Sequence, residues 1–425
     1  MNQENLSVWH NANIIDATGR APYLGHVVMR NEVLLHVGPG APEGVAASTA
    51  NQRDLQGRYL LPGMMDCHVH LTMDAQPKLN PPDSEQARML ALLRASRNAL
   101  RTLHAGVTTV RDCGTPGHID FALRRAAQEG WCMTPRLMLS GQALCMTGGH
   151  GWQFLGVEVD GVDGARRAAR AQLKAGADNV KLIATGGILT PGAAIGNTQL
   201  TEAEMRAAVE EAHNAGKIAA AHAHGGEGVK NAIRAGVDSV EHGYFIDEHG
   251  IDLMLEHGTW LVPTSAAVRN VVLQGTAAGI PDEVVDKARS AIDAHVSGFK
   301  AARKAGVRMV VGTDAGVPFT QHGSNLDELV YLVEMGMTPM EAIQTATRDS
   351  ARLLKLDARL GTLEAGKLAD FIVVDGDPMA SITVLREPER IRQVVLNGQV
   401  VVDRDLSQYV LGAAFSGIQH GKGGL

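Results

Sequence analysis

The apolar positions of this chain fall into three zones that differ in spacing. Up to about residue 60, short extended apolar runs alternate with turn residues, and Arg30-Asn31-Glu32 separates two runs as a hairpin turn would. From Ser84 to about residue 359, Ala- and Leu-rich stretches of helical length alternate with short apolar runs. Extended runs return at residue 369, and Asn397-Gly398 is a strong hairpin signal. The pattern predicts β segments at both ends of a mixed central region.

One repeated unit organises the central region. A helical stretch ends at a glycine, the usual residue just past a helix, and a short apolar run typical of buried parallel strands follows. The glycines of these units are Gly106, Gly176, Gly216, Gly236, Gly258 and Gly306, and two more strands are expected at 64–70 and 136–140. Eight units predict an α/β fold, a (β/α)8 TIM barrel, with its active site at the carboxyl ends of the strands.

The terminal β segments are too small to close alone, so we expect them to pair with each other. They predict a small β-sandwich domain built from both chain ends, residues 1–61 plus 360–411, beside the barrel at 62–359. The Gly-rich residues 412–425 form a C-terminal tail in this interpretation.

Composition narrows the function classes. The net charge of −7 argues against a nucleic-acid partner. The four cysteines lack CxxC spacing, which disfavours a disulfide framework or a thiolate zinc site. The first residues do not resemble a signal peptide, and no apolar run reaches the roughly 18 residues of a membrane span. We therefore expect a cytoplasmic protein with no membrane partner.

Six residues at the expected strand ends are candidate metal ligands. His68 and His70 lie two apart in a strand and project to one face. The other four end later strands, which converge on one mouth in a closed barrel: Lys181, His222, His242 and Asp314. Each alone has a structural explanation, such as a surface lysine, a core histidine or a helix N-cap aspartate. Together they suit two divalent metal ions.

The lysine suits such a site only as a neutral or anionic group. Burial beside two cations favours the neutral amine, which can add carbon dioxide to give a carbamate that bridges the metals. We assign His68, His70 and Asp314 to the more buried ion, His222 and His242 to the more exposed one, and N6-carboxylated Lys181 to the bridge. A hydroxide is the second bridge and the nucleophile, since zinc lowers the pKa of bound water to roughly 7. Asp314 is expected to accept its proton.

The chain resembles the amidohydrolase superfamily of metal-dependent TIM-barrel hydrolases over nearly its whole length. The matching motifs are Pro62-Gly63-Met64-Met65-Asp66-Cys67-His68-Val69-His70, Val180-Lys181, Ala221-His222-Ala223-His224-Gly225, Val240-Glu241-His242-Gly243, Gly312-Thr313-Asp314-Ala315-Gly316 and residues 361–370. Arg348-Asp349-Ser350-Ala351 departs from the Asn-Pro-Ala that relatives often carry, a difference that touches packing. Within the superfamily, the chain is most similar to the prolidase-like, imidazolonepropionase-related group, which includes ochratoxin-hydrolysing amidohydrolases.

The resemblance implies hydrolysis of the amide bond to a C-terminal amino acid, in a dipeptide, an N-acyl amino acid or ochratoxin A. Zinc is the expected metal, and a large homo-oligomer is implied, with an octamer as the candidate size. Catalytic roles fall to Asp314, His150 and His242. His150, in the Gly148–Gly151 loop, is expected near the scissile carbonyl, and His224 near the substrate carboxylate. Both histidines have an alternative explanation as plain loop residues.

A charge count agrees with an anionic substrate. Two divalent ions bring about four positive charges, and the carbamate, Asp314 and hydroxide offset about three, so roughly one remains to attract a carboxylate. The expected mouth loops carry Leu189, Trp152, Val317 and Phe319, which indicate an apolar pocket, with Leu189 and Val317 as substrate contacts. Phenylalanine is our first expected leaving amino acid.

Two other interpretations stay open. A single-metal deaminase or an imidazolonepropionase-like cyclic-amidine hydrolase uses the same fold, but needs no bridging lysine, so Lys181 disfavours it. The second is a catalytically inactive barrel kept for assembly, which the complete set of six ligand positions disfavours. Counting tightly bound metals per chain distinguishes one-metal from two-metal chemistry.

Overall fold

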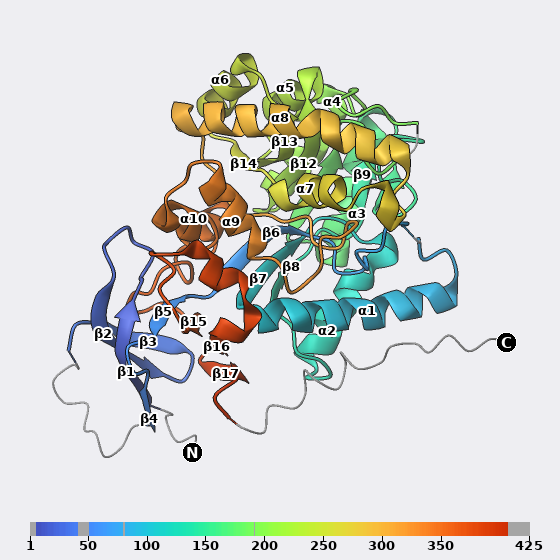
Figure 1. Cartoon of the computed structure of the whole chain (residues 1–425). Helices are drawn as coiled ribbons and strands as arrows, with labels where there is room; N and C mark the ends of the chain where they lie inside the picture. Colours follow the sequence, from blue (N-terminus) through green and yellow to red (C-terminus); the bar gives the residue numbers. More distant parts are fainter. Residues whose placement is uncertain (1–5, 41–50, 80, 191, 407–425) are drawn as a thin grey trace.

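The computed structural model describes residues 6–40, 51–79, 81–190 and 192–406 (Figure 1). The predicted C-terminal tail at 412–425 lies outside the described residues, as does the end of the predicted small domain at 407–411. Within the described ranges, no helix is long and apolar enough to cross a membrane.

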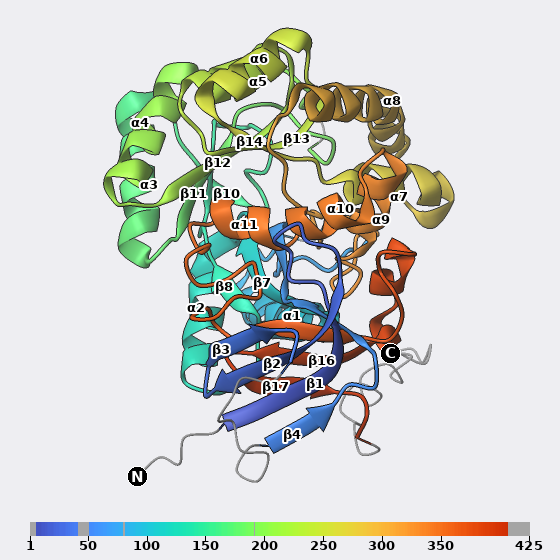
Figure 2. The ribbon, with the colours of Figure 1, turned by 90° about the vertical axis from the view of Figure 1, so that its left-hand side faces the viewer.

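Strands from both ends of the chain form one sheet. They are β1 (Leu6–Ile14), β2 (Tyr23–Arg30), β3 (Val33–Gly38), β4 (Asn51–Asp54), β5 (Tyr59–Pro62), β15 (Phe371–Val374), β16 (Ile391–Leu396) and β17 (Gln399–Asp403). Their order is β17-β16-β15-β5-β1-β2-β3, with β4 beside β1, so hydrogen bonds join the two expected sheets into one. Trp9 meets Phe371 edge-on in its core, with ring centroids 4.9 Å apart. The small domain built from both ends is confirmed (Figure 2).

Seven parallel strands and one closing segment form the barrel. The strands are β6 (Met64–Val69), β7 (Val107–Asp112), β8 (Arg136–Met138), β11 (Asn179–Ile183), β12 (Ile218–Gly225), β13 (Ser239–Phe245) and β14 (Trp260–Val262). Between β8 and β11, the N–H of Asp178 donates to the carbonyl of Leu139 at 2.7 Å. Residues 308–311 take the eighth position, because their carbonyls accept the N–H groups of Leu261 and Cys67 at 2.9 Å. The predicted (β/α)8 barrel is confirmed.

Helices lie around the outside of these strands (Figures 1 and 2). They are α1 (Glu85–His104), α2 (Ile119–Gln128), α3 (Gly161–Ala175), α4 (Glu202–Asn214), α5 (Gly226–Arg234), α6 (Glu248–His257), α7 (Ser265–Gln274), α8 (Asp282–Ala305), α9 (Asp327–Glu334), α10 (Pro339–Thr345) and α11 (Arg348–Leu353). Two short strands, β9 (Ala143–Cys145) and β10 (Gly156–Glu158), follow β8. Short 3-10 helices are η1 (Pro116–His118), η2 (Thr276–Ala278), η3 (Ile382–Arg386) and η4 (Pro388–Arg390). The domain boundaries at 61/62 and 359/360 stay a prediction.

Candidate active site

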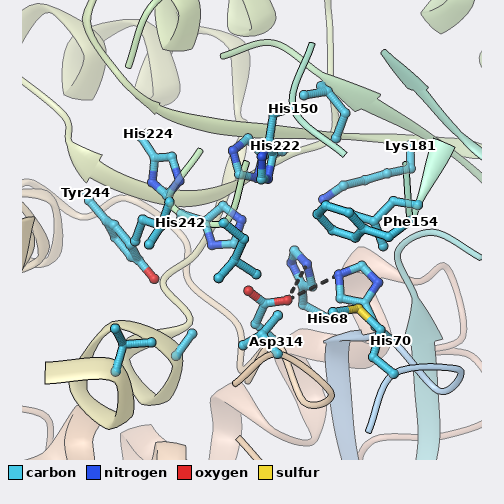
Figure 3. Close-up of a pocket in the computed structure, with 18 residues that line it drawn as sticks. His68, His70, His150, Phe154, Lys181, His222, His224, His242, Tyr244 and Asp314 are labelled. Atoms are coloured by element: carbon cyan, nitrogen blue, oxygen red, sulfur yellow. Dashed lines mark ion pairs between the residues drawn. The ribbon is translucent and has the colours of Figure 1, made fainter. Parts of the chain in front are cut away.

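The six predicted metal ligands line one pocket at the carboxyl ends of the barrel strands (Figure 3). His68 stands near the end of β6 and His70 directly after it, so the i, i+2 spacing does place both side chains in the pocket. Later strands supply Lys181 from β11, His222 from β12 and His242 from β13, and Asp314 follows the eighth strand segment. Closure of the barrel therefore brings together, in one pocket, residues that lie up to about 250 positions apart in the sequence.

Two groups of ligand atoms overlap in this pocket. His68, His242 and Asp314 form one group, and His222, His224 and His242 form the other, each with its atoms within 4.8 Å of one another. His242 belongs to both groups, and its ring centroid lies 5.1 Å from that of His68 and 4.6 Å from that of His222. The geometry has room for more than one ligand set around a shared histidine.

Hydrogen bonds behind two rings turn their lone pairs toward the pocket. Nδ1 of His70 lies 3.2 Å from the carbonyl oxygen of Gly114, which can only accept, so Nδ1 carries the proton. His68 donates its Nδ1 proton to the carboxylate of Glu241 at 2.7 Å. The Nε2 lone pairs of His68 and His70 then face Oδ1 of Asp314, at 3.4 and 3.2 Å. Three acceptor atoms so close repel one another unless a cation lies among them, as zinc–imidazole–carboxylate chemistry provides.

Two buried polar atoms in the same place have no partner. Nζ of Lys181 and Oδ1 of Asp314 accept or donate no hydrogen bond among the described residues. Burying such atoms unpaired costs about 1–3 kcal/mol each, and more when the group is charged. Burial opposes the ionised form of Asp314, yet positive charge beside it, on His68 and His70 when protonated and on Lys181, lowers its pKa to about 2. An ionised carboxylate, two oriented lone pairs and an unpaired amine together fit bound divalent metal.

The predicted substrate contacts also line the pocket, whereas two other residues of the expected mouth loops do not. His150, His224, Leu189 and Val317 line it. Burial lowers the pKa of both His150 and His224 to about 3, so both imidazoles are neutral near pH 7. Trp152 and Phe319 are not among the described lining residues, and Trp152 is 41% exposed. The indication of an apolar pocket rests instead on other side chains: Met73, Phe154, Leu155, Ile183, Ile188, Ala267 and Val271.

Comparison with known proteins places this geometry in a family. A sequence model of the amidohydrolase family matches residues 59–401. The chain belongs to the amidohydrolase family. It is 30% identical over 409 residues to ochratoxinase from Aspergillus niger, which covers 88% of this chain and 82% of the fungal protein. An imidazolonepropionase from Methylobacterium nodulans is 28% identical over 419 residues, covering 87% of this chain and 93% of that protein.

A solved structure resembles this amidohydrolase over almost its whole length. It is a Xaa-Pro dipeptidase with methionine bound in the active site, 35% identical with a TM-score of 0.84, covering 93% of this chain and 99% of that chain. The chain is therefore a hydrolytic enzyme of a metal-dependent family with a TIM-barrel fold. The clustered histidines and Asp314 are the groups in this amidohydrolase that agree with metal dependence.

Sequence reasoning missed the residues of this amidohydrolase that hydrogen-bond to the predicted ligands from outside the pocket. Arg111 of β7 donates to Glu241 of β13, which in turn accepts from His68. Nδ1 of His242 lies 2.7 Å from Oγ1 of Thr264, at the start of α7. A charged residue within an otherwise apolar buried strand is the available sequence signal for Arg111 and Glu241, because such residues are almost never buried unless paired.

Backbone strain accompanies two of the predicted ligands. His242 and Asp314 have φ angles of 72° and 61°, in the left-handed region that non-glycine residues seldom adopt. Such conformations cost of order 1–3 kcal/mol and persist where surrounding structure fixes them, often at functional sites. His242 lies within β13 and Asp314 follows the eighth strand segment, and both side chains line the pocket.

Proposed function

We propose that this amidohydrolase cleaves the amide bond to a C-terminal amino acid with an apolar side chain. The substrate is a dipeptide, an N-acyl amino acid or ochratoxin A, and the free carboxylate stays on the leaving amino acid. The observation that carries this proposal is a single pocket that joins six ligand-type side chains to an apolar wall. Similarity to an ochratoxinase and to a Xaa-Pro dipeptidase supports the same bond class.

We assign the roles of metal ligand and bridge to the following residues of the chain. His68, His70 and Asp314 would hold one divalent ion, and His222 and His242 the other, with Lys181 between them. Lys181 would bridge after its neutral amine adds to carbon dioxide, which forms an N–C bond and releases one proton. When bound, the metals would supply Lewis acidity that lowers the pKa of water and polarises a carbonyl. We propose zinc as the metal.

Proton transfer is assigned to Asp314. Its carboxylate faces the pocket beside both histidines of the first strand, and its low pKa keeps it ionised and able to accept a proton. It would take a proton from the attacking water and deliver it to the leaving nitrogen, the usual work of a general acid–base group. We also propose a catalytic role for His242, because it belongs to both groups of ligand atoms.

Recognition of the leaving amino acid is assigned to the rest of the pocket. Of the described lining residues, Lys181 is the only lysine or arginine, and the hydroxyl of Tyr244 already donates to the carbonyl of Thr264, so the remaining donors for a carboxylate are histidines. His224 is proposed for this role, since its buried Nδ1 has no described partner. Leu189 and Val317, with their apolar neighbours, would enclose the side chain. Phenylalanine has the size and polarity that such a wall favours.

A one-metal enzyme, either a deaminase or a cyclic-amidine hydrolase, is the second candidate. One observation favours it: His224 joins His222 and His242 in a three-histidine group that needs neither Lys181 nor Asp314. Metal analysis of purified enzyme decides between the two, because the proposed hydrolase binds two ions per chain and the alternative binds one.

The test of the proposal is a hydrolysis screen of zinc-loaded enzyme. N-acyl-phenylalanine, dipeptides that end in phenylalanine, and ochratoxin A are each incubated, and free phenylalanine is measured by mass spectrometry. We expect release from at least one of them, and none from the matched His68→Ala/His70→Ala variant. No release from any substrate, together with one metal per chain, would exclude the two-metal amide hydrolase.

Two further expectations stay predictions. A homo-oligomer, with an octamer as the candidate size, is tested by light scattering of the purified chain. Cytoplasmic location is tested by fractionation of the source cells. Neither bears on the chemistry of the pocket.

A further inference from the structure

Thr190, which belongs to none of the sequence motifs, hydrogen-bonds the ring of His150. Oγ1 of Thr190 lies 2.8 Å from Nδ1 of His150 and accepts the backbone N–H of Gly151 at 3.2 Å. The backbone N–H of His150 donates to Oε1 of Gln199 at 2.9 Å. Thr190 and Gln199 belong to the segment after β11, and His150 to the segment after β9. Two mouth segments are thus joined through this imidazole, with Thr190 and His150 both buried.

The pattern of donors decides which ring nitrogen carries the proton. A threonine hydroxyl has one proton to give. Of the two described partners of Oγ1 of Thr190, the N–H of Gly151 can only donate, so Nδ1 of His150 is the one described acceptor for the hydroxyl proton. Nδ1 is then the acceptor, and the ring proton lies on Nε2. His70 is the opposite case, since the carbonyl of Gly114 takes its Nδ1 proton and leaves Nε2 as a lone pair.

Space around the ring supports a fixed orientation. A Cβ placed on Gly187 would lie 2.5 Å from Nε2 of His150, so the ring packs directly over this glycine. No described residue hydrogen-bonds Nε2, and His150 lines the pocket, 4.4 Å from the ring of His222. Nε2–H is therefore available to an acceptor in the pocket, such as a carbonyl oxygen, and unsuited to a metal ion, which needs a lone pair.

We propose that Thr190 is a positioning residue that fixes His150 as the Nε2–H tautomer, with that proton directed at the carbonyl oxygen of the scissile amide. The role at the carbonyl rests on the proposed amide hydrolysis. Ile188 and Leu189, which directly precede Thr190, line the apolar part of the pocket. The segment that contacts the leaving side chain is thereby the segment that orients His150.

Kinetics of matched variants test the positioning role. Thr190→Val removes the hydroxyl and keeps the shape, and we expect kcat on N-acyl-phenylalanine to fall about ten- to a hundredfold, the scale of a small misplacement of a catalytic group. KM stays within about twofold because Ile188 and Leu189 are intact. Thr190→Ser keeps the hydroxyl and restores most of kcat. Thr198→Val, an exposed threonine of the same segment with no described side-chain hydrogen bond, is the control.

A double variant separates positioning from general damage. In a His150→Ala background, Thr190→Val should reduce kcat less than about twofold further, since a shared interaction is lost only once. Two results would overturn the proposal: losses that multiply, or a Thr190→Val effect no larger than that of Thr198→Val.

A readout independent of turnover is the protonation of the ring in the holoenzyme. Nitrogen-15 NMR of histidine-labelled enzyme, with His150 assigned through His150→Gln, should show a protonated Nε2 and an unprotonated Nδ1. Thr190→Val should lose this single tautomer, and Thr190→Ser should keep it. A protonated Nδ1 in the wild-type enzyme would refute the proposal. A wild-type enzyme that shows the Nε2–H form but cleaves no amide would refute the proposed function and leave the positioning role supported.

Discussion

The guanidinium of Arg111 donates a 2.8 Å hydrogen bond to Glu241, and neither side chain is exposed to solvent. Arg111 also donates to Oγ of Ser239 at 3.0 Å, and Glu241 accepts from His68 on its other oxygen. Arg111 lowers the pKa of Glu241, and Glu241 raises the pKa of Arg111, so both stay charged although burial opposes it. This buried pair fixes the tautomer of a predicted metal ligand.

Removing the cation of that pair should destabilise the fold. Arg111→Met leaves Glu241 buried and unpaired, and we expect the free energy of unfolding to fall by about 3–5 kcal/mol. The surface pair Arg125–Glu129 is the control, since Arg125 is largely exposed and Arg125→Met should cost at most about 1 kcal/mol. Urea unfolding followed by circular dichroism measures both values. Equal effects of the two substitutions would contradict the importance of the buried pair.

Lys181 provides the sharpest test of the bridging role. Lys181→Ala should lose most activity and one or both metals, because the two ions then lack their proposed bridge. A short carboxylate such as acetate, added at millimolar concentration, should partly restore turnover by taking the place of the carbamate. Metal content by mass spectrometry and turnover on N-acyl-phenylalanine are the measurements. Full activity with two metals retained would remove Lys181 from the bridge.

Asp314 should matter for turnover more than for substrate binding. Asp314→Asn keeps the size of the side chain but cannot accept a proton, so we expect kcat to fall at least about a hundredfold, the scale of a general base. KM should change far less, provided that the metals are shown to remain by elemental analysis. An unchanged kcat would exclude Asp314 as the proton acceptor.

The carboxylate-reading role of His224 predicts non-additive losses. Masking the substrate carboxylate as an amide should cost a charge-assisted hydrogen bond of about 1.5–3 kcal/mol, or roughly ten- to a hundredfold in kcat/KM. His224→Ala should cost as much on the free acid and little more on the masked substrate. If the two losses multiply, His224 does not contact the substrate carboxylate. Its role would then be in the three-histidine group that it forms with His222 and His242.

Stability should depend on pH through Glu328, remote from the ligand atoms. Its carboxylate is buried and accepts the N–H groups of Ser265 and Ala266 at 2.8 and 2.7 Å, at the start of α7. Burial raises its pKa to about 7, above the unfolded value. Its contribution is therefore complete below about pH 4.5 and is lost as pH rises through 7.

Comparison with Glu328→Gln isolates this one group. The difference in unfolding free energy between wild type and variant should shrink by about 3 kcal/mol from pH 4.5 to pH 8, since one pKa unit corresponds to about 1.4 kcal/mol. Denaturant unfolding of both proteins in matched buffers measures it. A difference that stays constant across this range would show that Glu328 titrates normally.

The barrel and its six ligand-type residues could be predicted from the sequence. The barrel and these residues follow from local spacing. A glycine ends each helix just before a short buried strand, and the i, i+2 spacing of His68 and His70 directs the two side chains to one face. Once eight such units are recognised, closure brings Lys181, His222 and Asp314 to the same mouth without any knowledge of the loops.

The groups that lie behind and around those predicted ligands could be read only from the three-dimensional arrangement. Arg111 and Glu241 are 130 residues apart, and Thr190 and His150 are 40 apart, with no periodicity that links either pair. The apolar wall likewise joins Phe154 and Val271, from separate segments over the mouth. Such contacts depend on how irregular loops fold back over a closed barrel, and the free energy that selects one loop path comes from distant packing partners rather than from neighbouring residues in the chain.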